Sequence, residues 1–297
     1  MRTIRSIAEM KAVTREARAR GLTVGLVPTM GFLHEGHLSL VRESKRRSDI
    51  TVVSIFVNPI QFGPKEDFRQ YPRDMDRDSG LLEGEGVDHL FCPEEDDMYP
   101  RGYATFAEVT GLQHKLCGLS RPIHFRGVCT VVLKLFNIVR PDLAFFGQKD
   151  AQQALIIRRM AADLDLDVSV EVRPIVREPD GLALSSRNVF LDPKERQAAL
   201  VLSRSLESAR GVLMKGERRA KEVIRGIGEI INKEPLARVD YIAAVDLETL
   251  EPVDRVEAKA LVALAVFIGR TRLIDNILFD PAEAAISSGP SKTMKGR

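Results

Sequence analysis

The sequence lacks any apolar run close to the roughly 20 residues that a membrane-spanning helix needs, so we expect no transmembrane segment. Its opening residues, Met1 to Arg5, also lack the apolar stretch of a signal peptide. Charge of one sign is not in excess, because 44 Lys and Arg face 42 Asp and Glu, for a net charge of +2. This near-balance gives no reason to expect a nucleic acid or a membrane surface as a partner.

Cysteine is scarce as well. The chain has 3 cysteines, Cys92, Cys117 and Cys129, an odd number without the spacing of a metal site. We therefore expect reduced thiols, a cytoplasmic protein and no metal site built from a ligand cluster. With 297 residues, 44% of them hydrophobic and 29% charged, the chain is long enough for one large or two ordinary globular domains.

The sequence is organised around residues 28–37, PTMGFLHEGH. An apolar run precedes this stretch, a helical pattern follows it, and a second apolar run comes at residues 49–57. This order predicts a strand, a glycine-bearing loop, a helix and a second strand, which form one βαβ unit. His34 and His37 are three positions apart at the helix start, where free N–H groups favour an anion such as phosphate. On the residues alone, exposed helix caps or a zinc site are alternatives. Zinc is less favoured because no third ligand lies nearby in sequence.

Two later loops carry similar chemistry. Residues 147–150 follow an expected strand at 142–146 and precede an expected helix at 151–164, so Lys149 can neutralise a phosphate there. Asp150 can cap that helix. The hydroxyls of Ser185 and Ser186 and the Arg187 guanidinium suit a triphosphate, although a simple turn before a helix is the alternative.

Two glutamines occupy positions that can face a ligand. Gln61 follows the second strand, at the edge where open α/β sheets bind ligands, and its amide can both donate and accept. Plain exposure to solvent is the alternative for Gln61. Gln153 lies one turn into the helix after Lys149 and can point to the same cavity. Arg126 can pair with phosphate or form an ordinary ion pair, and His124 stays unassigned.

The remaining patterns complete an α/β expectation: a Rossmann-like parallel sheet with helices on both faces and a smaller C-terminal α+β domain. We expect a nucleotide- and ligand-binding domain at 1–175, a lid domain at 176–281 and a disordered tail at 282–297. We expect further helices at 6–20, 131–139, 192–214 and 218–232, and further strands at 87–91, 105–109, 168–176, 239–245, 261–268 and 271–278.

The motifs resemble those of a known family. PTMGFLHEGH resembles the signature of the pantothenate synthetase (pantoate–β-alanine ligase) family, and H-x-G-H is similar to the adenylate-handling motif of the wider nucleotidyltransferase superfamily. VNPIQFG, YPRD, HFRGV, FFGQKD and GLALSSRN are similar to later family motifs in the same order, so the resemblance covers residues 1–280. One departure is Leu184, where methionine is frequent in the family and only backbone contact is expected.

The resemblance implies roles for individual residues. Gln61 and Gln153 would bind pantoate, and Gln61 would also contact β-alanine. The residues implied in catalysis are His34, His37, Lys149 and Arg187. The implied ATP site consists of Met30, Gly31, His34, His37, Gly147, Gln148, Lys149, Asp150, Val176, Leu184, Ser185, Ser186 and Arg187.

The implied reaction is ATP-dependent ligation of (R)-pantoate and β-alanine to pantothenate through a pantoyl-adenylate, with release of AMP and pyrophosphate. ATP with Mg²⁺ would be a substrate, no cofactor would be tightly bound, and the protein would be a homodimer. Read without the resemblance, the residues also permit an adenylate-forming enzyme with another acceptor, or a nucleotide sensor without catalysis.

Overall fold

The computed structural model describes residues 1–64 and 66–282, and the chain divides into two compact units, Met1–Phe190 and Leu191 onwards. This division falls later than the boundary that we expected at 175/176, so residues 176–190 belong to the first unit. The predicted tail at 282–297 lies outside the described residues, apart from Ala282. Within the described part, no helix combines the length and the apolar character needed to cross a membrane.

The first unit is built on a parallel sheet of six strands, which confirms the predicted α/β class. Its outermost strand, at residues 2–4, was not predicted, because three residues are too few to show a pattern. The strand expected at 105–109 is wrong, since the backbone N–H of Ala107 donates to the side chain of Thr130 and forms no ladder. In spatial order the strands are β1 (Arg2–Ile4), β4 (His89–Phe91), β3 (Ile50–Ile55), β2 (Val24–Thr29), β5 (Leu143–Gly147) and β6 (Ser169–Arg173).

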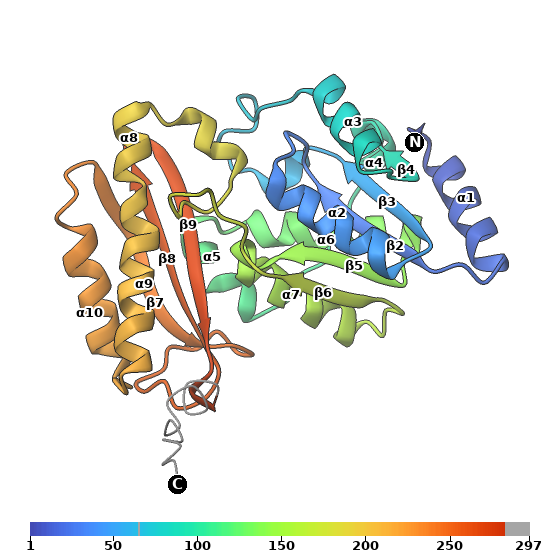
Figure 1. Cartoon of the computed structure of the whole chain (residues 1–297). Helices are drawn as coiled ribbons and strands as arrows, with labels where there is room; N and C mark the ends of the chain where they lie inside the picture. Colours follow the sequence, from blue (N-terminus) through green and yellow to red (C-terminus); the bar gives the residue numbers. More distant parts are fainter. Residues whose placement is uncertain (65, 283–297) are drawn as a thin grey trace, which may run out of the picture. The chain divides into compact units, whose positions relative to one another are not determined.

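Helices cover both faces of this sheet (Figure 1). Connections between parallel strands are right-handed, so a reversal of strand order along the sheet moves the connecting helix to the other face. Accordingly, α2 (Glu35–Arg47) and α3 (Met75–Gly84) share one face, where they contribute to a single core. The other face carries a contacting layer of α1 (Ile7–Ala19), α6 (His124–Val139) and α7 (Ala151–Asp163).

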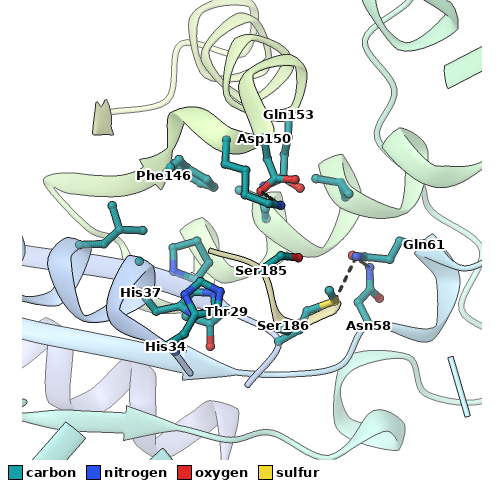
Figure 2. A pocket seen from close by; sticks show the side chains of 18 of the residues that line it. Thr29, His34, His37, Asn58, Gln61, Phe146, Asp150, Gln153, Ser185 and Ser186 are labelled. Carbon is teal, nitrogen blue, oxygen red and sulfur yellow. Dashed lines mark hydrogen bonds and ion pairs between the residues drawn. The ribbon is translucent and has the colours of Figure 1, made fainter. Parts of the chain in front are cut away.

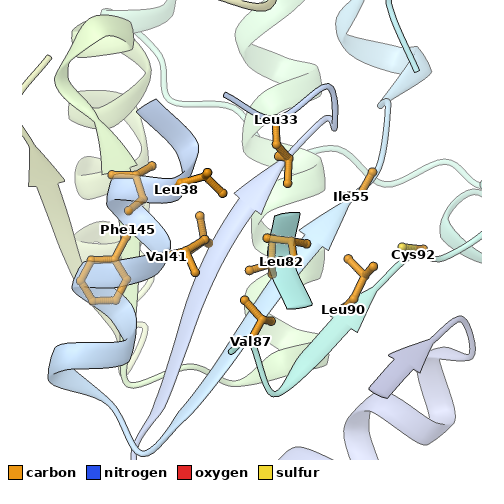
Figure 3. Close-up of a cluster of buried hydrophobic side chains, with 12 residues drawn as sticks. Leu33, Leu38, Val41, Ile55, Leu82, Val87, Leu90, Cys92 and Phe145 are labelled. Carbon is orange, nitrogen blue, oxygen red and sulfur yellow. The ribbon is translucent and has the colours of Figure 1, made fainter. Parts of the chain in front are cut away.

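The core under α2 shows why the organising stretch is fixed in place (Figure 3). Leu38 and Val41 lie one turn apart on the helix and are buried with Val27 and Val53 of the central strands. Leu82 of α3 joins the same cluster and is fully buried. The loop between β2 and α2 is therefore held at both ends by buried apolar side chains.

Short elements fill the connections of the first unit. The helix that we expected at 131–139 begins at His124, so HFRGV forms its first turns and is not a loop. These short elements are η1 (Pro59–Gln61), α4 (Glu95–Met98), η2 (Leu112–His114), α5 (Cys117–Ser120), η3 (Gln148–Asp150) and η4 (Ser186–Phe190).

The second unit is the predicted small α+β domain. An antiparallel sheet, in the order β7 (Ala237–Asp246), β8 (Ala260–Ile268) and β9 (Thr271–Phe279), packs against helices. The single helix expected at 192–214 is broken at Ala199. It begins where Asp192 caps the backbone and Pro193 fixes the first turn. The helices are α8 (Pro193–Ala198), α9 (Leu200–Met214) and α10 (Ala220–Ile231).

Candidate active site

The first unit contains a cavity of about 220 Å³ beside the carboxyl ends of β2, β3 and β5. Nearly every residue implied by the motifs lines it, and Gly31 and Gln148 are the exceptions (Figure 2). The predicted residues in the lining are Met30, His34, His37, Gln61, Gly147, Lys149, Asp150, Gln153, Val176, Leu184, Ser185, Ser186 and Arg187. Segments that are up to 157 positions apart in the sequence thus meet in one cleft.

Hydrogen bonding fixes which nitrogen of His37 carries its proton. The backbone N–H of His34 donates to Nδ1 of His37 at 3.3 Å, so the proton of a neutral His37 ring is on Nε2. The two imidazoles lie with ring centroids 4.0 Å apart. Gly36 permits this arrangement, because a Cβ at that position would fall 2.9 Å from the His34 ring. The glycine of H-x-G-H therefore makes room for its first histidine.

Both histidines are uncharged at neutral pH. Burial, with Lys149 nearby, lowers the pKa of His34 to about 4. Burial also holds the pKa of His37 well below its ordinary value, and His34 and Lys149 add to this effect. Among the described residues, Nδ1 of His34 is buried with no hydrogen-bond partner. These rings can therefore act as polar donors and acceptors toward a ligand, whereas a fixed positive charge is supplied by Lys149.

The loop that carries this motif is held by a residue that sequence reasoning missed. Asp78 of α3 is 1% exposed, and its carboxylate accepts the backbone N–H groups of Phe32 at 2.6 Å and Leu33 at 2.8 Å. These bonds hold a bend in which Gly31 has a φ of 81° and Phe32 a φ of 50°. Residues 65–78 are rich in charged side chains, a composition that favours a solvated loop and helix, and this interpretation is wrong for Asp78. Its spacing of four from the buried Leu82 was the available signal.

Gln61 is buried, so exposure to solvent does not explain it. Its backbone is in tight contact with the start of α6, because a Cβ on Gly127 would lie 2.5 Å from Cα of Gln61. The glycine of HFRGV therefore lets helix α6 approach the loop that carries Gln61. Arg126 does not line the cavity. Its Nε lies 3.8 Å from Oε1 of Glu108, and its guanidinium lies over the ring of Phe106. The contact with Glu108 confirms the ion-pair interpretation.

His124, to which the sequence assigns no role, lines the cavity beside Gln61. Its Nε2 lies 3.2 Å from the Arg121 guanidinium, which can only donate, so Nε2 accepts. Its Nδ1 therefore carries the proton and donates to the backbone carbonyl of Gln61 at 3.0 Å. Burial lowers the pKa of His124 to about 3 and keeps this arrangement neutral.

The arginine of the third motif is held by a forked ion pair. Nε and Nη2 of Arg187 donate to the Asp67 carboxylate at 2.9 and 3.0 Å. The hydroxyl of Ser186 donates to the carbonyl oxygen of Phe32 at 3.3 Å and joins this segment to the H-x-G-H loop. Asp150 occupies the N-cap position of α7, but its side chain makes no capping hydrogen bond and lies 3.6 Å from Nζ of Lys149. The predicted capping role of the Asp150 side chain is therefore wrong.

The fold and the cleft together define an open α/β protein with helices on both sheet faces and a polar ligand cleft at the carboxyl edge. The family model described as pantoate-beta-alanine ligase matches residues 2–278. A pantothenate synthetase from Pelotomaculum thermopropionicum is 59% identical over 273 residues, covering 92% of this chain and 97% of that protein. One from Heliobacterium modesticaldum is 59% identical over 280 residues, covering 94% and 100%. The chain belongs to the pantoate–beta-alanine ligase family, as its motifs predicted.

Solved structures agree with this family and with the fold. The crystal structure of pantothenate synthetase from Thermus thermophilus is similar to this chain with a TM-score of 0.89 and 47% identity, covering 93% of this chain and 99% of the other. A pantoate-beta-alanine ligase from Francisella tularensis has a TM-score of 0.77 and 33% identity, covering 95% and 99%. That protein was crystallised in complex with beta-gamma ATP and beta-alanine.

Proposed function

We propose that this pantoate–beta-alanine ligase uses ATP to activate (R)-pantoate as a pantoyl-adenylate and then transfers the acyl group to β-alanine. The observation that carries the proposal is the convergence of His34, His37, Lys149 and Arg187 on the cleft that Gln61 and Gln153 also line. The beta-gamma ATP and beta-alanine in the complex of the Francisella relative support ATP and β-alanine as substrates of this chain.

In the first step, a pantoate carboxylate oxygen attacks the α-phosphorus of ATP, and the bond from that phosphorus to pyrophosphate breaks. Such a reaction depends on in-line placement and charge neutralisation more than on proton transfer. His37 would donate its Nε2–H to an α-phosphate oxygen, and Lys149 would supply the positive charge. Ser185, Ser186 and Arg187 would hold the outer phosphates, and Arg187 would exchange Asp67 for phosphate oxygens.

In the second step, the neutral amine of β-alanine attacks the activated carbonyl carbon, and the bond to AMP breaks. The amine loses one proton in this step. Because the pKa values of His34 and His37 are low, both rings are weak bases, and the proton would pass to water. We therefore assign His37 to stabilisation of phosphate charge instead of proton donation.

Mg²⁺ would enter the cleft as part of the ATP substrate, because this ion takes most of its ligands from phosphate oxygens and water. Asp150 is the acidic side chain among the described residues that line the cavity. Its place beside Lys149 fits a carboxylate that would contact a hydrated ion bound to ATP. The ion would neutralise phosphate charge during departure of pyrophosphate.

The decisive experiment measures exchange of labelled pyrophosphate into ATP. We expect exchange with pantoate alone, no exchange with β-alanine alone, and AMP release only when all three substrates are present. Exchange with other acids but not with pantoate would indicate a different acceptor, and ATP binding without exchange would indicate a sensor. The homodimer and the closure of the second unit as a lid stay predictions. Light scattering can test the homodimer. Solution-scattering profiles recorded with and without ATP can test the closure.

A further inference from the structure

A chain of three buried or half-buried side chains leads away from the cavity and ends at Tyr99. The Tyr99 hydroxyl donates to Oδ1 of Asn58 at 2.7 Å. Nδ2 of Asn58 donates both to Oε1 of Gln61 and to the carbonyl oxygen of Gly127, each at 3.0 Å. Asn58 is 1% exposed, so each of its polar atoms depends on these partners.

The direction of every bond in this chain follows from one carbonyl group. The Gly127 oxygen can only accept, so the Asn58 atom beside it must be the amide nitrogen. That nitrogen is also next to Gln61, which must therefore present its own oxygen to Asn58. The oxygen of Asn58 is left facing Tyr99, whose hydroxyl donates. Burial raises the pKa of Tyr99, so the phenol keeps its proton at neutral pH.

This chain sets which end of the Gln61 amide faces the cavity. Because Oε1 is turned to Asn58, Nε2 points the other way, where it lies 3.1 Å from the sulfur of Met30 (Figure 2). A thioether is a weak acceptor, so this contact leaves the two N–H groups suited to a better oxygen acceptor. The sequence suggested an amide that both donates and accepts toward a ligand, whereas the structure orients it to donate.

We propose that Tyr99 is a positioning residue for the acid substrate: through Asn58 it holds the Gln61 amide with its N–H groups toward the pantoate oxygens. The inference rests on the proposed function, in which Gln61 binds pantoate. Removal of the Tyr99 hydroxyl leaves Oδ1 of Asn58 buried without a donor, so that the Gly127 carbonyl alone holds the orientation of the Asn58 amide and the chain is less firmly fixed. Binding of pantoate is weakened, whereas binding of ATP is not.

The test compares Tyr99→Phe with Tyr103→Phe, a matched control. The ring of Tyr103 meets the ring of Tyr99 edge to face, with centroids 5.1 Å apart, but Tyr103 is not part of the amide chain. Calorimetry in the presence of an ATP analogue that cannot be cleaved between its α- and β-phosphates gives the Kd for pantoate, even in variants that turn over poorly. We expect Tyr99→Phe to raise this Kd about fivefold to tenfold, with the Kd for ATP unchanged and Tyr103→Phe like wild type.

A double-mutant cycle separates positioning from general loosening. If Tyr99 acts through Gln61, the change Tyr99→Phe has no effect on the pantoate Kd in a Gln61→Ala background. Three results would each overturn the inference. The first is an equal effect of Tyr99→Phe on the pantoate Kd in the wild-type and Gln61→Ala backgrounds. The others are a loss of ATP affinity equal to the loss of pantoate affinity, and a Tyr99→Phe protein with the wild-type pantoate Kd. Failure of the wild-type protein to bind pantoate would instead refute the proposed function, and the inference with it.

Discussion

The change Asp78→Asn tests whether one buried carboxylate holds the H-x-G-H loop. The carboxylate accepts two backbone N–H groups, from Phe32 and Leu33, and hydrogen bonds to a charged acceptor contribute roughly 1.5–3 kcal/mol each. An asparagine has the same shape but keeps one acceptor oxygen, and its NH₂ group would face the other backbone N–H. We therefore expect the free energy of unfolding to fall by about 2–4 kcal/mol.

The same change should reduce catalysis, because the loop leads directly into His34 and His37. A misplacement of about 1 Å commonly costs about 10²-fold in rate. We expect pyrophosphate exchange to fall by about this factor in Asp78→Asn protein that is still folded. Urea unfolding gives the stability, and exchange at low urea concentration gives the activity of the folded fraction.

Asp76→Asn is the matched control, because Asp76 is exposed on the same helix. An exposed change of this kind should alter the free energy of unfolding by no more than about 0.5 kcal/mol. If Asp78→Asn unfolds at the same urea concentration as Asp76→Asn and exchanges pyrophosphate at the wild-type rate, Asp78 does not hold the loop.

Three further predictions concern the cleft. Lys149→Ala should lower the rate of adenylate formation, measured by pyrophosphate exchange, by about two orders of magnitude, because the change removes a preorganised positive charge. Turnover near the wild-type rate would exclude Lys149 from the mechanism. Gln61→Ala should raise the KM for pantoate far more than the KM for ATP. Gln61→Glu should raise the KM for pantoate further, because a carboxylate would then face the carboxylate of the substrate. A smaller effect of Gln61→Glu than of Gln61→Ala would contradict the donor orientation of the Gln61 amide. The pKa of His34 is lower in the folded protein than in the unfolded chain, so its stabilising effect is complete above pH 6.5 and is lost as the pH falls toward about 4. Urea unfolding between pH 7 and 4 should therefore show a loss of stability over this range that is smaller in His34→Gln protein; equal losses would place His34 in a more solvated environment.

Local patterns in the sequence predicted the scaffold well. Apolar runs at 24–27 and 49–57 correspond to central strands, and the glycines near His34 correspond to a bend and to a close approach. These features depend on nearest neighbours along the chain, which is why they can be read from sequence. The lining of the cleft could also be anticipated, because the carboxyl ends of parallel strands meet at one edge of a sheet.

The interactions that orient the site could not be read in this way, because they join distant segments. Asp78 is a surface-type residue in a charged stretch until folding places it under Phe32 and Leu33. Tyr99 and Asn58 are 41 positions apart, and no periodicity links them. The start of α6 was placed too late because Arg126 and Gly127 suggest a loop, whereas the glycine is required by the backbone of Gln61.

The close approach at Gly127 also bears on which acids the cleft can accept. No space for even a methyl group exists between α6 and the backbone at Gln61, and protein interiors of this density do not deform gradually. The wall formed by these two segments is therefore of fixed size. The side of the cleft at Arg187 differs, because this side chain is held by an ion pair with Asp67, which it would exchange for phosphate oxygens under the proposed function. Tolerance for bulkier substrate analogues should consequently be found on the arginine side and be absent on the glycine side.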